Sequence, residues 1–186
     1  MMEIDQPNYR FCPFCGSALV TRMEEDRERR YCAKCDWTYY PRVAASVSAI
    51  ICDDRHVLLV KRRRNPFKGT WMFPSGFVDL GEHPDEALSR EIKEETGLAL
   101  QRSHLLGVFQ SEDDPREYGH FVFFYTVAVS RGAIQTDPSE NEDIRWFAIE
   151  AVNESVEIAW KLHKHFMEEL RSGRLASLVP KDTWMQ

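Results

Sequence analysis

Three glutamates, Glu91, Glu94 and Glu95, have the spacing i, i+3, i+4 that places side chains on one face of a helix. Carboxylates held so close repel one another and weaken an isolated helix by roughly 0.2–0.5 kcal/mol per pair. A cation bound between them would turn this repulsion into attraction. Oxygen ligands favour hard ions such as Mg²⁺ or Mn²⁺, and such ions usually act on phosphates. The spacing therefore predicts a divalent metal site that acts on a phosphorylated compound.

Four of the five cysteines form two pairs with two residues inside each pair: Cys12, Cys15, Cys32 and Cys35. Sixteen residues separate the pairs, which is zinc-ribbon spacing. Four thiolates would complete a tetrahedron with no open position, so the predicted Zn²⁺ is structural and not catalytic. Two disulfides are the alternative, but nothing else in the sequence indicates an oxidising compartment. A module this small would draw much of its folding free energy from the metal.

The composition predicts a globular protein with one substantial core and a small additional module, because 186 residues include 43% hydrophobic side chains. No run approaches the roughly 18 apolar residues of a membrane helix, and the first residues are acidic where a signal peptide would be basic and then apolar. We therefore expect a cytoplasmic protein that does not enter a membrane. The net charge of −6 gives no general attraction to nucleic acid.

The sequence changes character at Pro41, which predicts a zinc ribbon over residues 1–40 and a larger domain over residues 41–186 that ends with a helix. Apolar, β-branched runs between turn residues predict strands in the larger domain, and the first two runs predict a hairpin. These strands are expected over residues 43–51, 56–60, 105–110, 121–129 and 144–149. An apolar stripe with helical spacing predicts the last helix over residues 153–170.

The helix that carries the three glutamates has clear signals at both ends. Pro84 suits its first turn and Gly97 suits its C-cap. Three apolar residues on the remaining face are expected to reach the core: Ala87, Leu88 and Ile92. A solvated acidic face without a ligand is the alternative, which the flanking glycines disfavour.

The stretch 76–98 also carries a longer pattern. Five residues separate Gly76 from Glu82, and seven more separate Glu82 from the pair Arg90-Glu91. The pattern then continues with an aliphatic residue, any residue, Glu94-Glu95, any residue, Gly97 and an aliphatic residue. This pattern resembles the signature of the Nudix hydrolases at every fixed position and without a gap. The resemblance extends over residues 41 to about 150. It implies an α/β/α sandwich with a mixed sheet. It also implies metal-dependent hydrolysis of the pyrophosphate in a nucleoside diphosphate linked to a group X.

The resemblance assigns roles to the residues of the pattern. It implies that Mg²⁺ or Mn²⁺ is bound by four groups: the side chains of Glu91, Glu94 and Glu95 and the main-chain carbonyl of Ser75. Arg90 would pair with a carboxylate such as Glu82 and orient the metal-binding glutamates. The general base often comes from outside the signature, and Glu140 is the first candidate, followed by Glu91 and then Glu142.

Two features outside the signature concern the substrate. The basic run 61–64 is either a solvated strand end or a phosphate-binding segment, in which Arg62 and Arg64 would contact the substrate. Four aromatic residues are candidates to stack on a base, with a place in the core as the alternative for each. They are Phe67, Trp71, Phe73 and Tyr118.

A zinc ribbon before a Nudix domain resembles the arrangement in NADH pyrophosphatases and in a related group that acts on FAD or ADP-ribose. The NADH enzymes carry a further motif, Ser-Gln-Pro-Trp-Pro-Phe-Pro, after the signature. Residues 107–115 have the sequence Gly-Val-Phe-Gln-Ser-Glu-Asp-Asp-Pro instead. We therefore place ADP-ribose or FAD before NADH as the expected nucleotide substrate.

Two other functions remain open from the sequence. The chain could hydrolyse a nucleoside triphosphate, or it could be a non-catalytic module that binds nucleic acid or protein through its zinc ribbon. The acidic net charge and the complete set of glutamates favour the enzyme. A homodimer is expected by resemblance, and the ribbon could stabilise that dimer, cover the active site or cap a sheet edge.

Overall fold

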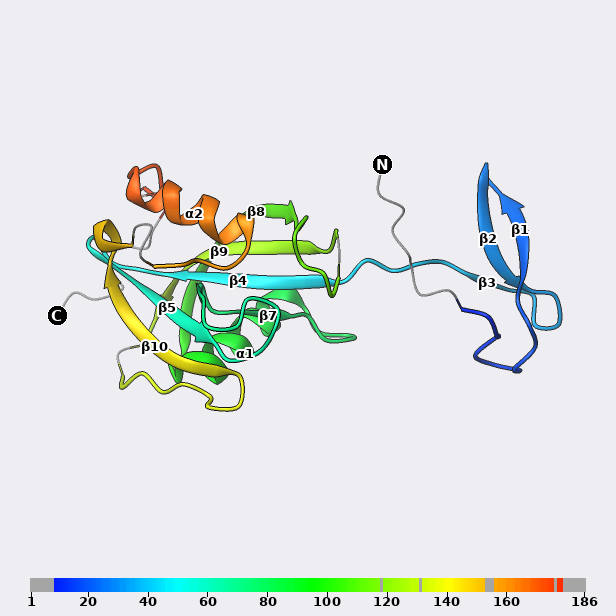
Figure 1. Cartoon of the computed structure of the whole chain (residues 1–186), viewed down its shortest axis with the longest axis horizontal. Coiled ribbons are helices and arrows are strands. Elements are labelled where there is room, and N and C mark those ends of the chain that lie inside the picture. The colour runs from blue at the N-terminus through cyan, green and yellow to red at the C-terminus, as the bar shows by residue number, and fades with distance from the viewer. Residues whose placement is uncertain (1–8, 118, 131, 153–155, 176, 179–186) are drawn as a thin grey trace. The chain divides into compact units, whose positions relative to one another are not determined.

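A computed structural model describes residues 9–117, 119–130, 132–152, 156–175 and 177–178. The chain divides into two compact units, Met1–Val43 and Ala44–Gln186, and the division falls close to Pro41. In the described part of the chain, no helix is both long enough and apolar enough to cross a membrane. Figure 1 labels the helices and strands of both units.

The first unit is a three-stranded antiparallel sheet in the order β1-β2-β3. Its strands are β1 (Val20–Glu24), β2 (Arg27–Cys32) and β3 (Trp37–Tyr39). Glu25 and Asp26 join β1 to β2 with φ angles of 48° and 61°, as a tight hairpin turn requires. The buried core of this unit contains Cys12, Leu19 and Cys32, with Cys15 and Trp37 packed against it. So small a core supports the prediction that the unit depends on a metal for stability.

The second unit contains two sheets, one of four strands in the order β7-β4-β9-β8 and one of three strands in the order β10-β5-β6. In the larger sheet β4 is parallel to β9, and the other pairs are antiparallel, so the sheet is mixed. The strands are β4 (Ala45–Ile51), β5 (His56–Arg62), β6 (Trp71–Met72), β7 (Ser75–Phe77), β8 (Leu100–Gln110), β9 (Phe121–Val129) and β10 (Asn141–Ala148). A short 3₁₀ helix, η1 (Ile149–Ala151), follows β10.

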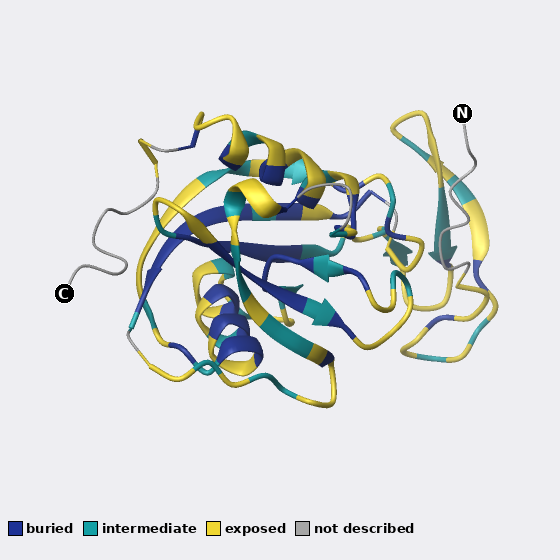
Figure 2. Cartoon of the chain, turned by 60° about the vertical axis from the view of Figure 1, so that its left-hand side comes forward, coloured by how far each residue is buried: buried dark blue, intermediate teal, exposed yellow. Residues whose placement is uncertain are grey.

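Helices α1 (Pro84–Thr96) and α2 (Lys161–Arg171) lie on opposite sides of the strands (Figure 1). Strand β4 contributes to both layers because successive side chains point to opposite faces. Ile50 belongs to the core cluster that contains residues of α2, whereas Val47 and Ile51 belong to the cluster that contains residues of α1. Figure 2 shows that buried residues follow these inner strands and the inward faces of the helices. The predicted α/β/α sandwich is confirmed.

The predicted hairpin over residues 43–51 and 56–60 is wrong. Both strands exist, but β4 pairs with β7 and β9, while β5 pairs with β10 and β6 in the other sheet. The two strands meet at a bridge between Cys52 and Val57, next to a turn in which the N–H of Asp53 donates to the carbonyl of His56 at 2.9 Å. Apolar runs on both strands allow each to be buried inside a different sheet, so adjacency in sequence does not decide the pairing.

The last helix begins later than the predicted 153–170. Residues 153–155 lie outside the described part of the chain, and the helix starts at Lys161. Before the helix, the main chain of residues 157–159 pairs with that of Trp71. The N–H of Trp71 donates to the carbonyl of Glu157 at 2.8 Å, and the N–H of Ala159 donates to the carbonyl of Trp71 at 2.8 Å. Trp160 then has a φ of 55°, which a helix interior does not allow. The tertiary pairing with Trp71 therefore overrides the helical apolar pattern.

Candidate functional site

Helix α1 is fixed at both ends, which sets the direction of its glutamates. His83 is the N-cap, and its side chain and that of Glu86 form a capping box. Gly97 ends the helix with a φ of 73°, and its N–H donates to the carbonyl of Lys93 at 3.0 Å. With this register, Glu91 and Glu95 are 8% and 3% exposed and face the larger sheet.

The carboxylate of Glu95 is held by two hydrogen bonds. The main-chain N–H of Ser75 donates to Oε2 at 2.7 Å, and the side-chain amide of Asn141 donates to Oε1 at 3.0 Å. Burial raises the pKa of Glu95 to about 8, and these two hydrogen bonds partly oppose that rise. The group is therefore a carboxylate in fixed orientation that a nearby positive charge would stabilise in its ionised form.

The carboxylate of Glu91 lies directly over the main chain of Gly76 in β7. A Cβ atom added to Gly76 would lie 1.8 Å from Oε1 of Glu91, so only glycine leaves room for this carboxylate. Burial raises the pKa of Glu91, and the hydrogen bond from Arg90 opposes the rise. Strand β7 thus supplies both the cradle for Glu91 and the amide that holds Glu95.

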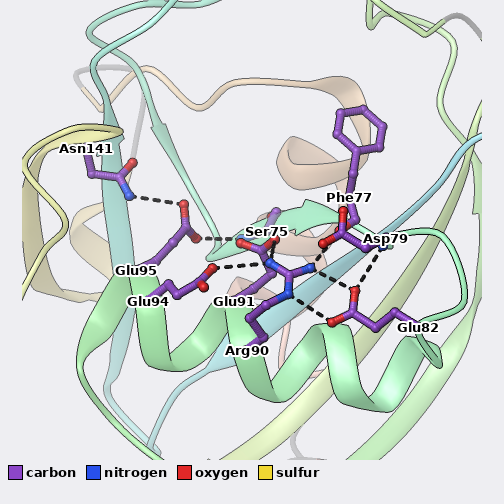
Figure 3. A network of polar contacts seen from close by, with 9 residues as sticks. All are labelled: Ser75, Phe77, Asp79, Glu82, Arg90, Glu91, Glu94, Glu95 and Asn141. Carbon is purple, nitrogen blue, oxygen red and sulfur yellow. Dashed lines mark hydrogen bonds and ion pairs between the residues drawn. The ribbon is translucent and has the colours of Figure 1, made fainter.

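Arg90 joins these groups to the loop that precedes α1 (Figure 3). It donates through Nε and Nη2 to the two carboxylate oxygens of Glu82, at 2.9 Å each, which is the predicted pairing. Its Nη1 donates to Glu91 at 2.6 Å and to Glu94 at 3.2 Å, and its Nη2 also reaches the carbonyl of Phe77 at 2.9 Å. The hydrogen bonds from Arg90 and from the N–H of Asp79 lower the pKa of Glu82 to about 2.

The three glutamates do not converge on one point. In the described residues, the one group of metal-ligating side chains that meets closely is formed by cysteines, whereas Glu91 and Glu94 are turned toward Arg90. The donor set nevertheless fits a divalent ion. Glu91 and Glu95 are buried carboxylates whose pKa values are raised by burial, and the Gly76 cradle keeps space for one of them. Hard oxygen donors of this kind suit Mg²⁺ or Mn²⁺.

A cavity of about 350 Å³ opens beside these residues. Its lining on this side comes from β7, α1, the first residue of β10 and the residue before it: Ser75, Gly76, Arg90, Glu91, Glu95, Asn141 and Glu140. Glu94 is not a lining residue, and its side chain is 56% exposed. Arg62 and Arg64 also line the cavity, as does Glu140, which accepts a hydrogen bond from Arg64 at 3.4 Å.

Apart from Glu94, four predicted residues that the structure describes do not line this cavity: Phe67, Trp71, Phe73 and Glu142. Phe73 is fully buried in the core, with ring contacts to Phe124 and His163, so the prediction that it stacks on a substrate base is wrong. Glu142 forms an ion pair with Lys61 at 3.8 Å and does not line the cavity. Tyr118 lies outside the described residues.

Sequence reasoning missed much of the cavity. Another part of its wall consists of polar and aromatic residues from three separate segments: Ser46, Ser111, Asp114, Arg116, His120 and Trp160. His120 is 6% exposed, and its ring nitrogens lie 3.1 Å from the hydroxyl of Ser46 and 2.8 Å from the carbonyl of Glu117. The pair Asp114 and Arg116, two residues apart in a loop, was the available signal for this wall.

The four paired cysteines meet in the first unit. All four sulfur atoms lie within 4.8 Å of one another, and Cys15 Sγ is 3.6 Å from Cys32 Sγ. A disulfide would require about 2.05 Å, so these cysteines are free thiols and the disulfide alternative fails. Zinc–sulfur bonds of about 2.3 Å in a tetrahedron place sulfur atoms roughly 3.8 Å apart, so the group fits a bound metal ion. Hydrogen bonds from Ser17 lower the pKa of Cys15 to about 6, whereas the hydrogen bond with Cys15 raises the pKa of Cys35 to about 12, so in the absence of a metal ion the thiolate is favoured at Cys15 and not at Cys35.

Comparisons with known proteins agree with this fold. The chain is 51% identical over 84 residues to an ADP-ribose pyrophosphatase of Methanocaldococcus jannaschii, covering 45% of this chain and 48% of that protein. It is 32% identical over 145 residues to the NAD-capped RNA hydrolase NudC of Pseudomonas aeruginosa, covering 77% and 49%. The solved NUDIX domain of Shewanella oneidensis NrtR with ADP ribose is 26% identical, with a TM-score of 0.62 over 78% of this chain and 94% of that one.

A further solved structure, a NUDIX hydrolase from Nitrosomonas europaea, shares the fold with a TM-score of 0.71 at 24% identity, over 89% of this chain and 94% of that one. The chain spans about half the length of most of the curated relatives that it matches. A sequence model of the NUDIX domain matches residues 42–170, well over half of the chain. On this match, with the sandwich fold and the complete signature on α1, the chain belongs to the NUDIX family.

Proposed function

We propose that the protein hydrolyses the pyrophosphate bond of a nucleoside diphosphate derivative, with ADP-ribose as the first candidate substrate. The observation that carries the proposal is the pair of buried carboxylates, Glu91 and Glu95, beside Ser75 in a cavity with basic residues. Relatives described as an ADP-ribose pyrophosphatase and as a domain bound to ADP ribose support this choice of substrate. FAD and NADH follow, and nucleoside triphosphates are the alternative substrate class.

Four groups of the chain would hold Mg²⁺ or Mn²⁺: the carboxylates of Glu91, Glu94 and Glu95 and the main-chain carbonyl of Ser75. The ion, when bound, would neutralise phosphate charge and make a water more nucleophilic. Arg90 contributes by holding Glu91 and Glu94 on one side and Glu82 on the other, so that the carboxylates cannot turn away freely.

Glu140 is the proposed general base. It lines the cavity, whereas Glu142 does not, and its side chain is 54% exposed, so water reaches it. Glu140 also lies near enough to raise the pKa values of Glu91 and Glu95 through charge repulsion, as a minor contribution after burial. Arg64, at 3.4 Å, holds this carboxylate at the cavity. In the first unit, the four cysteines are proposed to bind Zn²⁺ as a structural ion.

A substrate screen tests the proposed reaction. Purified protein would be incubated with ADP-ribose, FAD, NADH and nucleoside triphosphates, each with Mg²⁺, with Mn²⁺ and with the chelator EDTA, and products would be separated by chromatography. We expect AMP from ADP-ribose with either ion, and none with EDTA. Salt-dependent binding to RNA without hydrolysis of any nucleotide would instead support a non-catalytic binding module.

Replacing Gly76 with Ala is expected to weaken the metal site without unfolding the protein. The added Cβ would displace the end of the Glu91 side chain, which can rotate, and Gly76 lies in a strand where alanine is allowed. We expect an increase of about 10-fold or more in the Mg²⁺ concentration that gives half-maximal activity. Gly132→Ala is the control, since its Cβ would meet Leu98 at an ordinary 3.6 Å. Equal Mg²⁺ dependence in both variants would argue against a metal role for Glu91.

A further inference from the structure

The part of the cavity wall around Trp160 contains two arginines from different segments. Arg62 ends β5, and Arg116 lies in the loop between β8 and β9. Both guanidinium groups lie over the ring of Trp160, with Cζ at 5.2 Å and 5.4 Å from its centroid. Two like charges against one ring repel each other: burial and Arg116 lower the pKa of Arg62, and the charges of Glu95, Asp114 and Glu140 only partly oppose this. An anion placed between them would remove this repulsion.

Arg62 is buried, with only 9% of its surface exposed. Its hydrogen-bond acceptors among the described residues are the carbonyl oxygens of Pro66 at 2.9 Å and Arg64 at 3.5 Å, and the sulfur of Met72 at 3.3 Å. None of these acceptors carries a negative charge. The carboxylates of Glu95, Asp114 and Glu140 lie near enough to act on Arg62 through space, but the hydrogen bonds given for Arg62 go to uncharged acceptors, so its guanidinium can still pair with an anionic ligand.

Arg116 is held rigidly by Asp114. Its Nε and Nη2 donate to the two carboxylate oxygens of Asp114 at 3.0 Å and 2.7 Å, and its main-chain N–H donates to the same carboxylate at 2.9 Å. Asp114 is 3% exposed, and its pKa is lowered: burial acts to raise it, but the hydrogen bonds from Arg116 outweigh that effect. The Cζ of Arg116 also lies 5.5 Å from the ring of Phe77. One edge of the guanidinium is used by Asp114, which leaves Nη1 available for a ligand.

The first turn of α2 adds positive potential to the same wall. Trp160 is its N-cap, Asp113 accepts the N–H of Lys161 at 2.8 Å, and the next two residues, Leu162 and His163, line the cavity. The positive end of the helix dipole is therefore near the cavity, and the Asp113 carboxylate on the first N–H offsets part of it. His163 accepts the N–H of Phe73 at Nδ1, at 3.1 Å, so in its neutral form the proton is on Nε2.

We propose that Arg62, Arg116 and the first turn of α2 form an anion subsite on this wall, with Trp160 as its floor. The ligand class is a phosphoryl group that is not held by the catalytic metal, either the second phosphoryl of a pyrophosphate substrate or the phosphate of a nucleoside monophosphate product. This assignment rests on the proposed function. It divides the cavity into a carboxylate wall that needs a metal and an arginine wall that binds phosphate directly.

Calorimetric titration in buffer without Mg²⁺ or Mn²⁺ tests the subsite independently of catalysis. The probes are inorganic phosphate, AMP and adenosine. We expect phosphate and AMP to bind. Adenosine should bind at least about 10-fold more weakly than AMP, because it lacks the phosphoryl group and the loss of one charge-assisted contact accounts for that factor. Adenosine binding as tightly as AMP would overturn the proposal, because the base and not the phosphoryl group would then be recognised.

The variant Arg116→Gln is expected to weaken AMP binding by at least about 10-fold. Because it leaves Asp114 buried without its cation, the double variant D114N/R116Q provides the same test with both charges removed. Arg145→Gln is the matched control: Arg145 is also bonded to an aspartate, Asp143, and lies over a tryptophan, Trp71, but does not line the cavity. Unchanged AMP affinity in both Arg116 variants would contradict the subsite.

Steady-state kinetics separate the subsite from the proposed reaction. With ADP-ribose and Mg²⁺, we expect Arg116→Gln to raise KM more than it lowers kcat, and Arg116→Lys to restore part of the loss through its charge. A kcat effect with unchanged KM would count against a binding role. If wild-type protein binds AMP through Arg116 but hydrolyses no nucleotide, the proposed function fails while the subsite stands.

Discussion

Replacing Glu94 with Gln is expected to lower kcat for ADP-ribose by at least about 100-fold, because the change removes a metal-binding charge while keeping the shape of the side chain. Glu94 is well suited to this test. Its side chain is 56% exposed and contacts Arg90 at 3.2 Å, so the substitution leaves no buried group without a partner. Thermal unfolding is therefore expected to change little. The measurement is kcat at saturating Mg²⁺, together with the Mg²⁺ concentration for half-maximal rate.

Glu86→Gln is the control on the same helix. Glu86 closes the capping box through its contact with the N–H of His83 at 3.0 Å, and glutamine can fill that position. Like Glu94→Gln, the substitution Glu86→Gln removes one negative charge from α1, so the two variants have the same net charge. We expect Glu86→Gln to retain nearly full activity. Retained activity in Glu94→Gln would contradict the metal-dependent mechanism, because the exposed carboxylate of the signature would then be dispensable.

Much of the glutamate wall is predictable from sequence because its parts are close together along the chain. The capping residues, the glutamate spacing and the pairing of Arg90 with Glu82 all lie within one loop and one helix. A single register of that helix fixes them together. Asn141 was not predicted, because it contacts Glu95 only after β10 has paired with β5, a contact between distant parts of the sequence.

The arginine wall could not be predicted in the same way. Asp114 and Arg116 are close in sequence, but their position over Trp160 depends on how the loop after β8 meets the start of α2. The same limit explains the wrong hairpin, since β4 and β5 are each apolar enough for several partners. It also explains Phe73, an aromatic residue near the signature that packs inward because β6 and β7 turn it toward Phe124.

Replacing Cys32 with Ser is expected to abolish metal binding by the first unit and to unfold that unit. Cys32 is fully buried, and the apolar core around it contains few other residues. Structural zinc contributes on the order of 10–16 kcal/mol to the folding of small zinc modules, far more than so small a core supplies. Elemental analysis should give about one zinc ion per wild-type chain and far less for the variant. Brief trypsin digestion should cut the variant at the arginines of β1 and β2.

Cys52→Ala is the control, because Cys52 is buried in the second unit and does not belong to the group of four cysteines. Its zinc content and its resistance to trypsin within the first unit should match those of the wild type. Cys52→Ala should instead lower the free energy of unfolding of the second unit, because a buried sulfur atom is lost from its core. If wild-type protein purified without chelator contains no zinc, the structural role of zinc is contradicted. Another bound ion would then have to explain the 3.6 Å separation between the sulfur atoms of Cys15 and Cys32.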